Sequence, residues 1–480
     1  MKKRVLLSAI VTIALCLSLI AGSTFALFTS DDDIDITLNS GHVEITAGLT
    51  DPVLYSVQPD AAGEEFDENG KPYSYVQQPG NTFANGGTAA IDPATGYIVL
   101  ERVTPGDKIT FNLTGVNDSN VRVQYRYKFE CVEGYDLMSG FVTTVEGNKY
   151  ASMAAYTSEW HNLDENSNIG TDVNNGAGIP LAIELPVSAG NIYKDLSATL
   201  KLTVEVVQMN ADTTDTDAAV VKYITTVKDS GELATKLASD EILHIFVRNN
   251  IAETVNVNFN LTDKTIDANG KSVHLNFTKD ANGKPITLEN VVVKNLNTKT
   301  INIATGVNGD LTVADSYFTS DTKLGSAGYN AFIAGRGDAN DNLSMTVENC
   351  IFDAQGVIDY GVYFMNIANL TIRDCKINNT KSWAIQGNGT LGNFVISGNT
   401  FTGCNGIIKG AIRGGAGTGS LSGNLTFANN TLVNCIKKES STNSGIFVYM
   451  NLTPVNGTIT FTNNIDNDVV ITKEDMGMLG

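Results

Sequence analysis

The chain shows two patterns of hydrophobic and polar positions, one in each half. In the first half, apolar and polar side chains alternate over residues 108–113, 121–129 and 200–206. Alternation with a period of two predicts strands of antiparallel sheets that bury one face and expose the other. We therefore predict that residues 27–210 form an all-β domain with a jelly-roll or β-sandwich fold.

The second half carries a six-residue repeat, in which an apolar residue comes first, Asn, Asp or Gly third, and usually an apolar residue sixth. Copies stand at residues 288–293, 313–318, 347–352, 372–377, 396–401, 427–432 and 461–466, so their starts are 25, 34, 25, 24, 31 and 34 residues apart. A fixed order with insertions of variable length is typical of a solenoid whose rungs stack while loops absorb the differences. Each unit also holds a second short apolar segment, which favours several short strands per turn. We predict a right-handed parallel β-helix over residues 229–475, and this repeat resembles the pectin-lyase-like superfamily.

The fourth position of the repeat predicts side chains that stack from one rung to the next. In chain order the residues of this structural ladder are Cys350, Cys375, Asn399, Asn430 and Asn464. Neighbouring parallel strands lie about 4.8 Å apart, which exceeds the usual Cβ separation of about 3.8 Å in a disulfide. We therefore expect the asparagines to form an amide ladder and the cysteines to be buried free thiols.

Residues 1–26 have the pattern of a secretory signal peptide. Three basic residues precede an apolar stretch at residues 5–21, and Thr24 and Ala26 supply the small side chains that a signal peptidase requires. We expect cleavage between Ala26 and Leu27 and export of the protein. An uncleaved membrane anchor is the alternative, although the apolar stretch is shorter than the span of about 20 residues that a bilayer needs.

Residues 211–228 are predicted to link the two domains. The first part of this segment is polar and acidic and has no periodicity. Asp212, Asp215 and Asp217 are spaced so that they could hold calcium, but a solvated linker is the favoured interpretation. We assign no metal site and no other cofactor, because the four histidines of the chain stand far apart and not at metal-ligand spacing.

The charge balance excludes one class of partner. The chain has 52 acidic and 32 basic residues, which gives a formal net charge of -20. An acidic surface of this size repels phosphate backbones, so we expect no binding to nucleic acid.

Short segments of the first half resemble the TasA/camelysin family. Residues 22–31 look like the junction that a SipW-type signal peptidase cleaves, and segments similar to the family follow in the family's order at residues 36–45, 103–107, 117–126, 158–160, 184–186 and 204–211. The resemblance implies an extracellular jelly-roll protein that builds biofilm-matrix or cell-surface fibres. Its partners would be a SipW-type signal peptidase, further copies of itself or other matrix fibres. Some family members are described as metalloproteases, but this chain has no HExxH motif that would carry that activity.

The resemblance to the pectin-lyase-like superfamily brings in polysaccharide lyases and glycoside hydrolases as alternatives. Lyases of this type need calcium-binding carboxylates and a base, and hydrolases need acids that converge on one face. The candidate ligand-binding residues fall on neighbouring rungs, with two aromatic rings able to stack on sugars: Asp353, Asp359, Tyr360, Arg373, Trp383 and Arg413. No paired-Asp motif stands out, so we assign no catalytic residue.

The sequence favours a secreted structural protein of the cell surface or biofilm matrix, whose β-helix is a spacer or a module that binds polysaccharide or another partner. A secreted polysaccharide lyase or hydrolase is the alternative.

Overall fold

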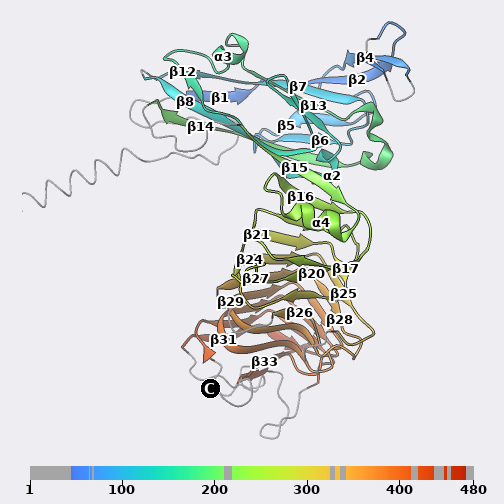
Figure 1. The fold of residues 1–480 in the computed structure, drawn as a ribbon, viewed down its shortest axis with the longest axis vertical. Helices are drawn as coiled ribbons and strands as arrows, with labels where there is room; N and C mark the ends of the chain where they lie inside the picture. The colour runs from blue at the N-terminus through green and yellow to red at the C-terminus, as the bar shows by residue number, and fades with distance from the viewer. Residues whose placement is uncertain are drawn as a thin grey trace, which may run out of the picture. The chain divides into compact units, whose positions relative to one another are not determined.

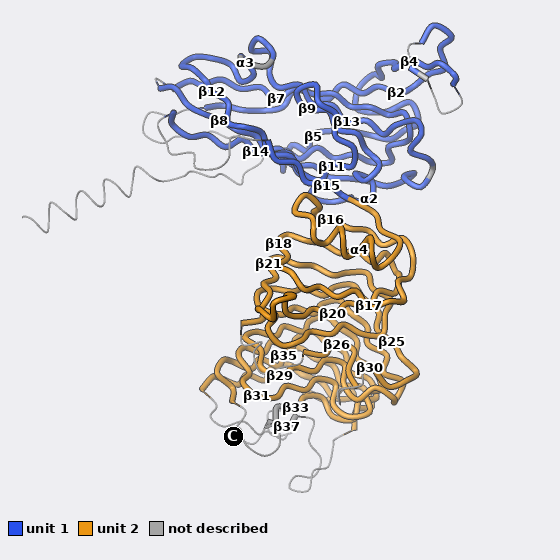
Figure 2. Tube along the Cα trace, viewed as in Figure 1, with its two compact units in different colours: residues 1–224 blue, residues 225–480 orange. Residues whose placement is uncertain are grey.

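A computed structural model of the chain describes residues 45–471, apart from residues 64, 67–69, 120, 210–218, 325–329, 336–341, 412–419, 437–447 and 451–455. Strands make up nearly all of its regular structure (Figure 1). The chain divides into two compact units, residues 1–224 and residues 225–480 (Figure 2). The signal-peptide residues, including Ala26 and Leu27, lie outside the described part.

Unit 1 is a sandwich of two antiparallel sheets. The first sheet has the order β10 (Asn148–Ala151), β9 (Val142–Val145), β13 (Ile179–Glu184), β7 (Asp107–Asn117), β2 (Val53–Pro59), β4 (Pro72–Gln77) and β3 (Glu65–Phe66), and β1 (Ile45–Leu49) pairs with β7 beside β2. The second sheet has the order β15 (Val220–Val227), β11 (Met153–Thr157), β8 (Val123–Glu133), β14 (Ser197–Gln208), β6 (Ile98–Glu101) and β5 (Thr88–Ile91), and β12 (His161–Leu163) also pairs with β8.

The alternating residues of the sequence form the core between these sheets. Phe111 of β7 and Tyr125, Tyr127 and Phe129 of β8 are almost completely buried, whereas the residues between them on each strand are partly exposed. Burial of one side of each strand is the arrangement that a period of two predicts. The prediction of an all-β fold with an N-terminal β-sandwich is confirmed.

The expected linker at residues 211–228 needs a correction in its second part. Residues 220–227 form β15, and the pairs from Val220↔Thr157 to Tyr223↔Met153 attach this strand to β11. Apolar and β-branched residues favour a strand when a neighbouring strand offers an unpaired edge. The first part of the expected linker, including Asp212, Asp215 and Asp217, lies outside the described residues.

Unit 2 begins with a short capped helix, α4 (Ser230–Leu237). The Asp229 carboxylate accepts a hydrogen bond of 2.9 Å from the backbone N–H of Glu232, and the Glu232 carboxylate accepts one of 2.9 Å from the N–H of Lys228. Side chains at the start of the helix thus satisfy N–H groups that have no partner within it. Leu233 and Leu237 are buried, and the helix lies against β16 (Ile242–Val247) and β17 (Ile251–Val257).

The rest of unit 2 is a parallel β-helix with three sheets (Figure 1). Sheet A contains β16, β19 (Thr265–Asp267), β21 (Ile286–Lys294), β24 (Val307–Ala314), β27 (Leu343–Glu348), the second halves of β29 (Tyr360–Arg373) and β31 (Trp383–Ser397), β35 (Leu425–Ala428) and β38 (Ile459–Thr462). Sheet B contains β22 (Asn297–Thr298), β25 (Tyr317–Thr319), β28 (Ile351–Asp353), β30 (Lys376–Asn378), β32 (Thr400–Thr402), β36 (Thr431–Val433) and β39 (Asn464–Asp466), and ends with antiparallel β40 (Val469–Ile471). Sheet C contains β17, β20 (Val273–Phe277), β23 (Ile301–Ile303), β26 (Ala331–Gly335), the first halves of β29 and β31, β33 (Ile408–Ala411) and β37 (Val448–Met450). Short strands β18 (Leu261–Thr262) and β34 (Ser420–Leu421) pair with β21 and β31.

The third position of the repeat turns the chain from sheet A into sheet B. Its residues have a left-handed backbone, with φ between 49° and 69°: Asp315, Asn349, Asp374, Gly398, Asn429 and Asn463. Gly, Asn and Asp are the residues that tolerate this conformation, which explains why the repeat is restricted to them.

The first copy of the repeat has a different register from the predicted one. Asn295, with φ of 54°, makes the first turn from sheet A into sheet B, so the copy is residues 293–298 and not residues 288–293. Asn290 also has a left-handed backbone, but it lies at a break in the register of β21, and its side chain donates a hydrogen bond to Asp263. A bulge can demand the same residue types as a corner, and the sequence pattern does not separate the two.

Within the described residues, we find no helix with the length and apolar character of a membrane span.

Candidate functional site

A ladder of buried side chains runs along the corner between sheets A and B. The oxygen Oδ1 of Asn430 accepts hydrogen bonds from the backbone N–H of Asn399 at 3.0 Å and from its side-chain amide at 3.1 Å. Asn464 accepts the same two bonds from Asn430, each at 3.0 Å. Each amide also donates to a backbone carbonyl, as Asn430 does to Ile396 at 2.9 Å. Every polar group of these buried side chains is therefore used within the ladder.

The ladder continues upward through two cysteines and a serine. The backbone N–H of Cys375 donates to Asn399 at 2.9 Å, and that of Cys350 donates to the sulfur of Cys375 at 3.4 Å. Ser316 holds the same position one rung above and accepts from the N–H of Leu296 at 3.0 Å. Both cysteines are buried free thiols, and the interaction of the Cys350 thiol with the neighbouring Cys375 sulfur, together with burial, raises the pKa of Cys350.

A second pair of free thiols, Cys404 and Cys435, lies just after the sheet B strands β32 and β36. The Cys404 sulfur donates to the carbonyl of Ile377 at 3.1 Å, and the Cys435 sulfur donates to the carbonyl of Phe401, one rung on, at 3.2 Å. The neighbouring sulfur of Cys435 lowers the pKa of Cys404 to about 7, and the Cys404 sulfur, together with burial, raises the pKa of Cys435. One sulfur of the pair thus stabilises negative charge on the other.

Three of the candidate ligand-binding residues come together where the strands β29 and β31 of sheet C begin. Tyr360 and Trp383 are partners in the register of β29 and β31, and the carbonyl of Asp359 accepts a hydrogen bond of 3.1 Å from the N–H of Ser382. The Tyr360 ring is partly exposed and lies 5.5 Å from the ring of Tyr363, whereas Trp383 is only 5% exposed. Little of the Trp383 ring is accessible to a sugar in this structure.

The structure does not join the other candidates to these three. Arg373 ends the sheet A part of β29, where its Nε donates to the carboxylate of Glu348 at 2.7 Å. Asp353 is the last residue of β28 in sheet B, in register with Asn378. Arg413 lies outside the described residues. In the part of the chain that the structure describes, we find no group of three or more His, Cys, Asp or Glu side chains arranged to hold a metal ion.

A groove follows the corner between sheets A and B on the outside of the solenoid; we call it the corner groove. Its volume is about 850 Å³, and its walls are formed by residues of the first rungs. One wall consists of the left-handed residues Asn295, Asp315 and Asn349, and the other of the residues two positions later, Asn297, Tyr317 and Ile351. These residues occupy the third and fifth positions of the repeat, but the repeat pattern alone did not predict a groove between them.

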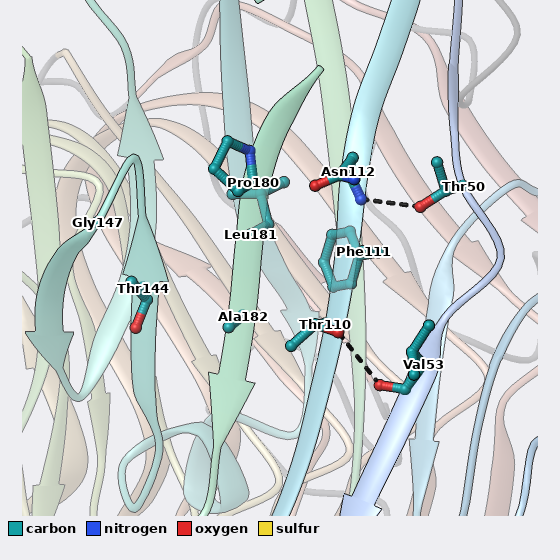
Figure 3. Close-up of a pocket in the computed structure, with 10 residues that line it drawn as sticks. All are labelled: Thr50, Val53, Thr110, Phe111, Asn112, Thr144, Gly147, Pro180, Leu181 and Ala182. Carbon is teal, nitrogen blue, oxygen red and sulfur yellow. Dashed lines mark hydrogen bonds between the residues drawn. The ribbon is translucent and has the colours of Figure 1, made fainter. Parts of the chain in front are cut away.

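Unit 1 has a smaller hollow on the outer face of its first sheet (Figure 3). The hollow measures about 280 Å³ and lies over β9, β13, β7 and β2, where small side chains such as Ala182, Thr110 and Thr144 leave space. The Thr50 hydroxyl closes one side of it, accepting a hydrogen bond of 2.9 Å from the N–H of Asn112. The ten residues that line the hollow carry no titratable group, so it offers shape and hydrogen bonds but no acid or base.

Comparisons with known proteins do not assign a family. No protein-family model matches the chain, and no curated protein matches it. Among solved structures, the L. reuteri 53608 SRRP is similar over 50% of this chain and 99% of its own, with 13% identity and a TM-score of 0.25. The catalytic domain of the GH87 alpha-1,3-glucanase D1045A in complex with nigerose covers 90% of this chain and 97% of its own, with 9% identity and a TM-score of 0.20. The catalytic unit of the thermostable GH87 alpha-1,3-glucanase from Streptomyces thermodiastaticus strain HF3-3 covers 87% of this chain and 96% of its own, with 10% identity and a TM-score of 0.18. These likenesses are remote, and the fold described above rests on the strand pairing of this chain itself.

Proposed function

We propose that this protein is a secreted structural component of a cell surface or biofilm matrix. In this proposal the β-sandwich joins the protein to a fibre, and the β-helix is a stiff spacer that presents a binding surface. The observation that carries the proposal is the ladder from Ser316 to Asn464, which ties successive rungs together through buried hydrogen bonds. A second ladder of Ser344, Asn369, Asn393 and Asn424, partly buried at its start and exposed at its end, links rungs at another corner.

Such cross-links favour a rigid rod over a hinged one. A rung can tilt only by breaking several hydrogen bonds at once, and an unsatisfied buried polar group costs about 1–3 kcal/mol. A stack of rungs held in this way keeps its two ends at a fixed separation. That property suits a stiff spacer that presents a binding surface along its length.

The attachment through the sandwich is proposed from the TasA/camelysin resemblance and supported by the pairing of β1. This strand pairs with β7 over Ile45↔Asn117 to Leu49↔Leu113, and Val53 resumes the pairing opposite Thr110. The residues before β1 are outside the described part, but in sequence they alternate apolar and polar side chains from Ile34. A segment of this type forms the same backbone hydrogen bonds with a neighbouring copy as with its own sheet, which would join subunits into a homopolymer.

Assembly of the mature chain tests this proposal. We expect the protein that begins at Leu27 to form filaments in light scattering and electron microscopy, and a version that lacks residues 27–40 to stay monomeric. Acidification should promote assembly because it reduces the net negative charge of the chain. If the full mature protein remains monomeric at high concentration and in acid, it does not form fibres by itself and the proposal fails.

A polysaccharide lyase or hydrolase is the second candidate, favoured by the neighbouring positions of Asp359, Tyr360 and Trp383 on sheet C. Incubation of the mature protein with acidic and neutral glycans separates the two functions. Release of reducing ends or unsaturated sugars, lost in Asp359→Asn, would support the enzyme and count against a purely structural role.

A further inference from the structure

The corner groove repeats the same pair of positions on each rung. After the first three pairs, the fifth-position residues Lys376, Thr400 and Thr431 continue its outer wall along sheet B in register with Ile351. Neighbouring rungs lie about 4.8 Å apart, as parallel strands do. The groove therefore offers one set of side chains per rung along a line parallel to the solenoid axis, an arrangement that matches a linear polymer and not a compact ligand.

The side chains of the groove suit an uncharged, hydroxyl-rich ligand. The exposed amide side chains of Asn297 and Asn349 each present donors and an acceptor, which is the combination that sugar hydroxyls require. Tyr317 and Ile351 are each 37% exposed, and they add an aromatic ring and an apolar surface on which the C–H face of a sugar ring can lie. Neither the amides nor these two apolar side chains require a charged group on the ligand.

Electrostatics disfavours anionic chains at the first three rungs of the groove. Among the ten residues that line this part, Asp315 is an acid and none is basic, and the first basic side chain of the outer wall is Lys376, one rung beyond Ile351. The chain as a whole carries a formal net charge of -20. An acidic polysaccharide would therefore be repelled both by Asp315 nearby and by the net charge of the protein.

The backbone of the groove is not available to a peptide. The N–H of Tyr317 donates to the carbonyl of Leu296 at 2.7 Å, that of Ile351 to Ser316 at 2.8 Å, and that of Asn349 to Arg373 at 3.2 Å. A peptide strand that adds to a sheet needs free backbone groups at an edge, and these groups bond to neighbouring rungs. Recognition in the groove must come from the side chains.

We propose that the corner groove binds a linear neutral polysaccharide, which lies along the solenoid axis across the rungs of Asn297, Tyr317 and Ile351. The inference rests on the proposed function, in which the β-helix presents a binding surface, and it names the surface and the class of ligand. The Tyr317 ring stacks on one sugar, and the asparagines on either side bind hydroxyls of that sugar and its neighbours.

Titration of the mature full-length protein tests the proposal. The probes are chitohexaose, cellohexaose and laminarihexaose, with hexagalacturonate as the anionic comparison, followed by isothermal calorimetry. We expect at least one neutral hexasaccharide to bind and hexagalacturonate not to bind. Tyr317→Ala should raise Kd by about tenfold, because it removes a contact worth about 1 kcal/mol or more. Asn349→Gly, which removes the side chain but tolerates the left-handed backbone, should raise Kd by about fivefold. Tyr317→Phe keeps the ring and should stay within about twofold of the wild type.

The matched control is Thr287→Ala, which shortens an exposed side chain of β21 that does not line the groove and should leave Kd unchanged. Absence of binding to every neutral probe, tighter binding of hexagalacturonate, or an unchanged Kd in Tyr317→Ala would each overturn the proposal. Filament formation is measured on the same samples. Normal filaments without glycan binding would reject the groove alone, and glycan binding without filaments would reject the structural role while the groove stands.

Discussion

The side-chain amide of Asn430 donates a hydrogen bond of 3.0 Å to Oδ1 of Asn464, one rung further along the solenoid, and neither residue is more than 1% exposed. The same Asn464 oxygen accepts the backbone N–H of Asn430 at 3.0 Å. One amide thus holds both the backbone and the side chain of its neighbour. This relationship explains why asparagine is suited to the fourth position: only asparagine and glutamine combine an NH₂ group with two donors and a carbonyl acceptor, and glutamine is longer.

Replacing Asn430 by Leu should destabilise the β-helix by about 2–4 kcal/mol. The substitution leaves the backbone N–H and the side chain of Asn399 without their acceptor, and each buried group that loses its partner costs about 1–3 kcal/mol. Thermal melting of the mature protein, followed by circular dichroism, measures the loss.

The control for this variant is Asn393→Ala. Asn393 makes bonds of the same kind, to Asn369 and from Asn424, but it is exposed. Water replaces the lost partners there, so the cost should stay below about 1 kcal/mol. Equal effects of the two substitutions would show that burial of the Asn430 ladder does not matter for stability.

Much of the solenoid could be read from the sequence because its corners make strict chemical demands. A left-handed backbone at Asp374 or Asn429 restricts the residue to Asn, Asp or Gly, and this restriction recurs visibly along the chain. The register of the first copy was wrong because the bulge at Asn290 imposes the same restriction as the corner at Asn295. Local chemistry identifies the conformation but not the sheet in which it occurs.

The candidate sites were harder to predict, because they depend on neighbours that come from other rungs. Arg373 is bound to Glu348, 25 residues away, and this pairing follows from the rung register and not from local sequence. The corner groove depends on Tyr317 and Ile351, which face outward and stay exposed where most apolar residues of the solenoid are buried. The sequence pattern marks such positions only as variable.

Processing of the N-terminus gives a direct prediction about export. N-terminal sequencing of protein from the culture medium should read Leu-Phe-Thr-Ser, beginning at Leu27, because Thr24 and Ala26 satisfy the small-residue requirement. Ala26→Arg should block cleavage and keep the protein with the membrane fraction. An intact Met1 in secreted or membrane-bound wild-type protein would contradict the assignment.

Acid should weaken the β-sandwich through Glu205. Burial alone would raise the pKa of this carboxyl group, but hydrogen bonds and charge from Lys128 at 2.6 Å and Arg126 at 2.5 Å outweigh it, so the pKa is lowered from its ordinary value of 4.5. A lowered pKa in the folded state contributes stability that is present above pH 4.5 and is lost as the pH falls through the folded pKa. Melting temperatures of the wild type and Glu205→Gln between pH 7 and pH 3 should converge as the pH falls. A constant difference across this range would show that the ion pairs contribute nothing to the acid sensitivity.

His244 should make the start of the β-helix sensitive to a milder acidity. This residue is 2% exposed in β16, and burial, reinforced by the positive charge of Lys294 and only partly opposed by Asp267, lowers its pKa from 6.5 to about 4. Because the unfolded chain takes up a proton more readily than the folded one, the stabilising contribution is complete above pH 6.5 and is lost between pH 6.5 and about pH 4. A pKa difference of this size corresponds to about 3 kcal/mol in the free energy of unfolding.

Hydrogen exchange of β16 and α4 should therefore accelerate as the pH falls through this window, after correction for the intrinsic exchange rate. His244→Leu carries no titratable group and should show a flat response. If the two proteins open with the same pH dependence, another group controls the stability of this rung.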